Sequence, residues 1–196
     1  MGKRAEIRNK RQKEKRNNIF VVVAIVGAFL IFLAWTSLSA NKTTTPTTVE
    51  GSVVPVEVNY PAPELTLGTV NGQNDSLANY RDKVVLVNNW ATWCPPCKAE
   101  MPTLVDFYNA HASENFMIVA IEAGEPQAEV QKFVDSFQMP FPVWLDPNGK
   151  SLQAFRNGTL PNSYVIDRTG TVRYTWTGQI NRAMLEKYVT PLFGQN

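Results

Sequence analysis

The sequence predicts an α/β sandwich with a mixed central sheet, preceded by one transmembrane helix. Three observations lead to this prediction. From residue 60 onward, short apolar runs alternate with segments of helical spacing, as in proteins that pack helices on a sheet. Two strand-like runs near the C-terminus are joined by a short turn, so part of the sheet must be antiparallel. Residues 19–38 carry no charge at all.

The first 40 residues combine a basic tail with this uncharged run. Residues 1–18 hold eight Lys and Arg residues and two Glu residues. As a helix, residues 19–38 would extend about 30 Å, the thickness of a bilayer's hydrocarbon core. Because the basic residues precede the run, the positive-inside rule places residues 1–18 in the cytoplasm and the chain after residue 40 outside it. The tail is thereby explained without a nucleic-acid partner.

We predict that residues 19–38 are an uncleaved single-pass anchor in the cell membrane. A cleaved signal peptide is the alternative, since Ser37, Ser39 and Ala40 are small enough for a processing site. The apolar core of a signal peptide is usually only about 7 to 15 residues long. The length of this run therefore favours the anchor.

Residues 39–58 are predicted to be a Thr-rich, extended tether, and residues 59–196 to be the globular domain. Pro46 and Pro55 stiffen the tether, and its β-branched residues disfavour a helix. The alternative for "SVVPVEV" (52–58) is an exposed strand added to the domain.

The elements of the domain follow from the spacing of apolar residues. Residues 84–90 ("VVLVNNW") and 116–123 ("FMIVAIEA") are continuous apolar runs, typical of buried strands. Further strands are expected at 64–67, 141–146, 163–167 and 171–178, the last two forming a hairpin around "RTG". Helices are expected at 95–112, at 126–137 with Pro126 at its start, and at 180–193, and "SLANYRDK" is expected to form a turn or a single helical turn.

Cys94 and Cys97 lie at the junction of a buried strand and a helix, in "WATWCPPCKAEMP". A disulfide across two residues closes a very short loop and stabilises little, and a zinc site needs about four ligands, whereas His111 is the chain's one histidine. A redox pair remains. At a helix N-terminus the backbone N–H groups and the dipole favour a thiolate, so Cys94 is expected to be the exposed, attacking sulfur. Cys97, one turn further in, is expected to resolve the mixed disulfide.

The stretch "VVLVNNWATWCPPCKAEMPTL" resembles the active-site strand and helix of the thioredoxin superfamily, and specifically the membrane-anchored ResA/TlpA-like thiol-disulfide oxidoreductases of cytochrome c maturation. The resemblance continues through "FPVWLDPNGKSLQAFRNGTLPNSYVIDRTGTVRYTWTGQI" and covers roughly residues 60–194. It implies a thioredoxin-like sandwich, a helix kinked at Pro102 and a cis bond before Pro161. It also implies that substrate contacts Trp93, Pro95, Pro96, Leu160 and Pro161, with the backbone of Leu160 pairing with an extended substrate segment.

Two further positions bear on proton transfer. Many thioredoxins carry a buried aspartate six residues before the first cysteine, where this chain has Asn88, which cannot take a proton. Glu100 matches a glutamate of the ResA-like group and lies three residues beyond Cys97, on nearly the same helix face. If buried, it would have a raised pKa and would accept the Cys97 proton. The alternative is a solvated glutamate paired with a lysine.

The prolines between the cysteines predict a reducing couple. Pro95 and Pro96 lack N–H groups, so a thiolate on Cys94 loses two donors at the helix start and depends mainly on the Cys97 amide. A less stabilised thiolate makes the dithiol less favoured. We therefore expect a lower reduction potential than in disulfide-forming oxidants.

Other residues receive structural interpretations. We expect His111 to be exposed and Trp90, Trp144 and Trp176 to be core or sheet-face aromatics. "DPNGK" (146–150) lacks the spaced carboxylates of a calcium site and is expected to be a turn. Glu122, at the end of a buried strand, is a weaker candidate for the site. No metal and no cofactor are expected, because the chemistry is exchange between sulfurs.

Three classes of function follow. The first is an extracytoplasmic reductant of protein disulfides such as apocytochrome c cysteines, recharged by a DsbD/CcdA-type membrane electron donor. The second is an oxidase that forms disulfides in secreted proteins. The third is a non-catalytic binding module on a thioredoxin scaffold, which the intact C-x-x-C disfavours. A peroxiredoxin-like peroxidase fits poorly, because its cysteine usually lacks a partner at this spacing.

Overall fold

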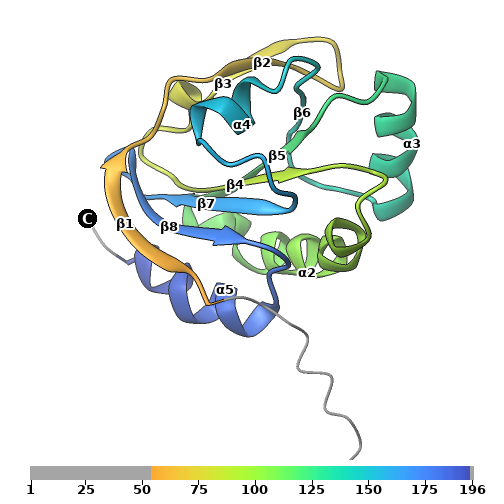
Figure 1. Ribbon diagram of the computed structural model, residues 1–196. Helices are drawn as coiled ribbons and strands as arrows, with labels where there is room; N and C mark the ends of the chain where they lie inside the picture. Colours follow the sequence, from red (N-terminus) through yellow and green to blue (C-terminus); the bar gives the residue numbers. More distant parts are fainter. Residues whose placement is uncertain (1–53, 195–196) are drawn as a thin grey trace, which may run out of the picture. The chain divides into compact units, whose positions relative to one another are not determined.

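Helices cover both faces of a mixed sheet in the computed structural model, which describes residues 54–194 (Figure 1). Within these residues the sheet has eight strands in the order β1-β8-β7-β4-β5-β6-β2-β3. The pairs β4–β5 and β5–β6 are parallel, and the other neighbours are antiparallel. The predicted α/β sandwich with a mixed sheet is therefore confirmed.

The strands are β1 (Val56–Pro61), β2 (Thr66–Thr69), β3 (Asn74–Ser76), β4 (Val84–Trp90), β5 (Phe116–Glu122), β6 (Val143–Leu145), β7 (Asn162–Ile166) and β8 (Thr171–Thr177). The α-helices are α2 (Pro95–His111), α3 (Gln127–Phe137), α4 (Lys150–Ala154) and α5 (Arg182–Tyr188). Short 3-10 helices occupy Leu77–Tyr80, Ala112–Glu114 and Thr190–Leu192.

The central strand β4 separates two hydrophobic clusters. Every residue of β4 is buried, and side chains alternate between the faces: Leu86 joins the cluster under α2, α3 and α5, whereas Val87 joins the cluster on the face that carries α4. Figure 1 shows α2 and α5 on one side of the sheet and α4 on the other. Burial on both faces explains why β4 starts with four consecutive apolar residues, 84–87; two buried asparagines and Trp90 complete the strand.

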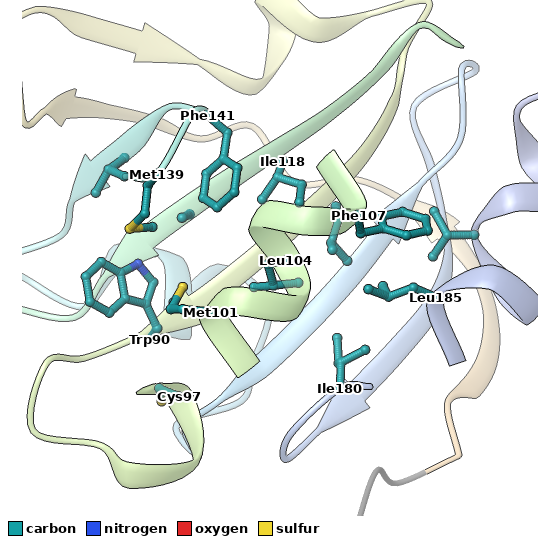
Figure 2. Close-up of a cluster of buried hydrophobic side chains, with 14 of the residues drawn as sticks. Trp90, Cys97, Met101, Leu104, Phe107, Ile118, Met139, Phe141, Ile180 and Leu185 are labelled. Atoms are coloured by element: carbon teal, nitrogen blue, oxygen red, sulfur yellow. The ribbon is translucent and has the colours of Figure 1, made fainter. Parts of the chain in front are cut away.

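Helix α2 supplies the centre of the larger cluster. Its buried residues include Cys97, Met101, Leu104 and Phe107, which follow one another along the helix (Figure 2). Pro102 lies inside the helix, as expected. Trp90, Trp144 and Trp176 are all fully buried, which confirms their interpretation as core aromatics.

Most elements appear where the sequence predicts them, with several differences, among them β6, which covers only Val143–Leu145 of the expected 141–146. Strand β2 begins two residues later than expected, and α5 ends at Tyr188, before a separate 3-10 turn. The short elements β3 and α4 were not predicted. The sequence "DPNGK" does form the expected turn, and α4 starts at its last residue.

The end of the predicted tether belongs to the sheet. Val56–Pro61 form β1, which pairs with β8 along the sheet edge, so the strand alternative holds for residues 56–58. The strand is almost wholly exposed, and its register shifts between Glu57 and Tyr60. A strand that is exposed on both faces and has a register shift does not show the alternating apolar pattern of a half-buried strand. The sequence therefore did not identify β1 clearly.

The predicted basic tail (1–18), the anchor (19–38) and most of the tether lie outside the described residues. Between residues 54 and 194, no helix has the length and apolar character needed to cross a membrane.

Candidate active site

The two cysteines form a disulfide at the start of α2. The S–S distance is 2.04 Å and the Cα atoms are 5.3 Å apart. Cys94 is the N-cap residue of α2, and its Sγ accepts a hydrogen bond from the backbone N–H of Cys97 at 3.4 Å. Because Pro95 and Pro96 occupy the first two helical positions, Cys97 carries the first N–H that can cap this sulfur. The single donor predicted from the sequence is therefore present.

Cys94 is far less exposed than we expected. Its relative exposure is 4%, against 0% for Cys97. In the disulfide state its sulfur is bonded to a fully buried sulfur and is thereby drawn onto the first helical turn. The difference in exposure has the expected sign, but the description of Cys94 as exposed is wrong for this state.

Apolar side chains surround the disulfide at the surface. Trp93 is 64% exposed, and Pro95 and Pro96 are exposed beside it. Leu160 is half-buried and packs against the cluster that contains both cysteines. The Leu160–Pro161 bond is cis, as the resemblance implied. These residues form an apolar rim suited to a polypeptide substrate.

Glu100 is fully buried, which excludes the alternative of a solvated helix residue. Its Oε1 accepts from Asn88 Nδ2 at 2.8 Å, and its Oε2 accepts from the backbone N–H of Ile180 at 2.9 Å. Burial raises the pKa of Glu100 to about 7, and the two hydrogen bonds limit the rise. A carboxyl group three residues from Cys97 therefore has a pKa suited to proton transfer near neutral pH.

The structure adds two further carboxylates beside the cysteine motif, Glu122 at the end of β5 and Glu125 in the loop that follows. From the sequence, Glu122 was a weaker candidate and Glu125 was not predicted. Glu125 binds the residue before Trp93 twice: its Oε2 accepts from Thr92 N at 2.6 Å and its Oε1 from Thr92 Oγ1 at 2.5 Å. Glu122 is fully buried and accepts from the backbone N–H groups of Gly124 and Glu125. Burial, and then the neighbouring Glu125 carboxylate, raise the pKa of Glu122 to about 7.

A sequence signal for Glu125 existed. Trp90 and Glu122 are paired at the ends of the parallel strands β4 and β5, so the loops that follow these strands meet at one edge of the sheet. Polar residues in the second loop are therefore expected near the cysteine motif in the first.

His111 was wrongly predicted to be exposed. Its side chain is 13% exposed and lies between the rings of Phe107 and Phe193, with centroid separations of 4.5 and 5.2 Å. Its Nδ1 lies 2.7 Å from Glu114 Oε1. The C-terminal segment folds back over the end of α2, which the helical pattern alone does not reveal. In the described part of the chain, no group of three or more His, Cys, Asp or Glu residues is placed to hold a metal ion.

A thioredoxin-like fold with a disulfide at the start of its central helix defines a thiol-disulfide oxidoreductase. The model of the AhpC/TSA family matches residues 58–175, and the chain belongs to this thioredoxin-like family. Among curated relatives, the thiol-disulfide oxidoreductase ResA of Geobacillus kaustophilus is 34% identical over 134 residues, covering 68% of this chain and 77% of its own. ResA of Bacillus subtilis is 30% identical over 176 residues, covering 90% and 94%.

Solved structures agree with this assignment. A thiol:disulfide interchange protein of the thioredoxin family from Chlorobium tepidum is 30% identical, with a TM-score of 0.64, over 71% of this chain and 99% of that one. A putative DsbE from the same organism is 25% identical, with a TM-score of 0.66 and the same coverage. The protein is therefore a thioredoxin-like thiol-disulfide oxidoreductase, and protein thiols and disulfides are its substrates.

Proposed function

We propose that this enzyme is an extracytoplasmic, membrane-anchored reductant of protein disulfides, with apocytochrome c cysteines as its substrate class. The observation that carries the proposal is Glu100, a buried carboxyl group with a pKa of about 7 on the same helix as Cys97. A reductant must deprotonate its second cysteine in each turnover, and Glu100 supplies an acceptor of suitable pKa. Residues 19–38 supply the anchor, with the catalytic domain outside the cytoplasm.

The reaction starts from the dithiol. The Cys94 thiolate attacks one sulfur of the substrate disulfide, so that a mixed disulfide forms and the first substrate thiolate leaves. Cys97 then gives its proton to Glu100, and the Cys97 thiolate attacks Cys94 Sγ. The second substrate thiolate leaves, and the Cys94–Cys97 disulfide is the product. Two electrons pass from the enzyme to the substrate, whose two thiolates take up protons from solvent.

The enzyme must then be reduced again. A domain outside the cytoplasm does not meet cytoplasmic thioredoxin, so a membrane electron donor of the DsbD/CcdA type is the partner that fits. The apolar rim of Trp93, Pro95 and Pro96 is the surface on which the substrate and this donor would take turns.

The reduction potential tests the direction of electron flow. The full chain in detergent micelles is equilibrated in dithiothreitol or glutathione buffers, and the disulfide is followed by Trp fluorescence. We expect a value near or below that of thioredoxin, about −270 mV. Reduction of an oxidised C-x-x-C-H peptide would then test the substrate class. A value near −120 mV, as in DsbA, would identify a disulfide donor and overturn the proposal.

A further inference from the structure

Three buried polar side chains form a chain of hydrogen bonds that ends at the loop before Pro161. Ser151 Oγ donates to Asn89 Oδ1 at 2.6 Å, and Asn89 Nδ2 donates to Asn162 Oδ1 at 2.8 Å. Asn162 Nδ2 then donates to the backbone carbonyls of Thr159 at 2.6 Å and Asn157 at 3.3 Å. All three side chains are essentially without solvent contact.

The direction of this chain is determined at the loop. Two carbonyl oxygens can only accept, so the NH₂ group of Asn162 must face them. Its Oδ1 therefore faces Asn89 and accepts, which in turn orients Asn89 Oδ1 toward the Ser151 hydroxyl. No amide in the chain can be turned over without placing two donors or two acceptors together. A buried network with all its partners has one conformation and is costly to interrupt.

The far end of the chain is also fixed. The backbone N–H groups of Lys150 and Ser151 each donate to the buried carboxylate of Asp146 at 2.8 Å. Ser151 is thereby held in place at the start of α4. The network thus connects the loop after β6, through Asn89 near the C-terminal end of β4, to the loop before β7.

Most of the loop's other polar groups also have hydrogen-bond partners within the domain. The carbonyl groups of Asn157 and Thr159 point to Asn162, and the Thr159 N–H donates to Asn157 Oδ1 at 3.0 Å. Asn157 Nδ2 in turn donates to Thr177 Oγ1 on β8. Leu160 differs, because neither its N–H nor its carbonyl has a hydrogen-bond partner among residues 54–194. Its backbone remains free to pair with another extended segment.

We propose that Asn162 and Asn89 are positioning residues, which hold the loop Asn157–Leu160 in the conformation that binds polypeptide substrate. This rests on the proposed function, in which the substrate is a polypeptide, and on the unpaired backbone of Leu160, with which an extended segment of that substrate can pair. A polypeptide uses this pairing, whereas a small disulfide reaches Cys94 without it. The two asparagines therefore set the preference of the enzyme for polypeptide over small disulfides.

The test compares two substrates. The reduced full chain, in detergent micelles, is assayed with an oxidised C-x-x-C-H peptide and with hydroxyethyl disulfide. We expect Asn162→Ala to lower kcat/KM for the peptide about tenfold, chiefly by raising KM, because the substitution removes the bonds that Asn162 makes to the two loop carbonyls and to Asn89. The rate with hydroxyethyl disulfide should change less than twofold. The reduction potential should stay the same as in the wild type. Asn109→Ala, an exposed asparagine on α2, is the matched control and should change neither rate.

Asn89→Ala should also lower the rate with the peptide relative to the rate with hydroxyethyl disulfide. The effect should be smaller than that of Asn162→Ala, because Asn162 keeps its bonds to the loop. If Asn162→Ala does not fold, as judged by circular dichroism, Asn89→Ala decides. Equal losses with both substrates, or no loss with the peptide, would overturn the inference. If the wild-type enzyme is instead a disulfide donor, the same variants are compared in oxidising a dithiol peptide and dithiothreitol, so the two proposals fail separately.

Discussion

Replacement of Glu100 by glutamine should remove much of the pH dependence of stability in the disulfide form. The Glu100 carboxyl group has a pKa of about 7 in the folded chain, against an ordinary value of 4.5. The folded state therefore binds this proton more tightly than the unfolded state does. Its contribution to the free energy of unfolding is full below about pH 4.5 and is lost as the pH rises to about 7.

The size of the effect follows from the shift. One pKa unit corresponds to about 1.36 kcal/mol, so the whole window is worth about 3 kcal/mol, and most of it falls between pH 5 and pH 8. Urea unfolding of the oxidised full chain in detergent micelles, at both pH values, gives the difference for wild type and for Glu100→Gln. On going from pH 5 to pH 8, the wild type should lose about 2 to 3 kcal/mol more of its free energy of unfolding than the variant.

Comparing the change between pH 5 and pH 8 in the two proteins cancels the effect of the substitution itself on the free energy of unfolding. Glutamine cannot accept from both Asn88 and Ile180 as the carboxylate does, and this loss is nearly the same at both pH values. Glu129→Gln, at an exposed position on α3, is the matched control and should follow the wild type. Equal pH dependence in wild type and Glu100→Gln would refute the reasoning, because the Glu100 proton would then be held equally in both states.

Three further predictions concern the cysteines and their loop. Pro96→Ala restores an N–H group at the second helical position, so the Cys94 thiolate gains a donor and the reduction potential, measured in glutathione buffers, should rise by about 30 mV, the equivalent of about 1.4 kcal/mol; an unchanged or lower value would contradict this role of the prolines. Cys97→Ser should accumulate a mixed disulfide between Cys94 and a substrate peptide, visible on non-reducing gels, whereas Cys94→Ser should form none. Thr92→Val and Glu125→Ala should each lower the free energy of unfolding and should do so non-additively, with a coupling of about 1 kcal/mol, because both remove the bond between Thr92 Oγ1 and Glu125 Oε1; additive losses would show that this bond contributes nothing.

The sequence predicts best those elements whose signal is local. Strand β4 and helix α2 carry continuous or helical apolar patterns, and their bounds match. Strand β3 spans three polar residues and exists through its pairing with β2, and α4 spans five residues capped by the Asp146 side chain. Neither has a periodicity of its own. Elements that depend on contacts with distant parts of the chain cannot be predicted from the residue pattern of their own segment.

The candidate site shows the same division. The spacing of Cys94, Cys97 and Glu100 predicts that they share one helix, and the structure has Cys94 at the N-cap of α2 and the other two in its first turns. The environment of Glu100 depends in addition on Ile180, 80 residues later in the chain, and the loop before Pro161 is held by a network whose long-range bonds join residues 62 and 73 positions apart. Asparagines at the end of an apolar strand were a visible anomaly, since buried polar groups need partners, but the sequence did not identify those partners.

Asn88 explains why the proton site can lie on the helix instead of the strand. A carboxyl group at position 88 would share the buried pocket with Glu100, and two carboxylates there would force one to remain protonated. The Asn88 amide instead donates to Glu100 Oε1 and to Ser163 Oγ, which favours the ionised form of Glu100 against the effect of burial. Burial alone would raise the pKa further. A pKa near 7 suits the role that the proposed function gives to Glu100, which is to take a proton from Cys97 and to release it again within one catalytic cycle.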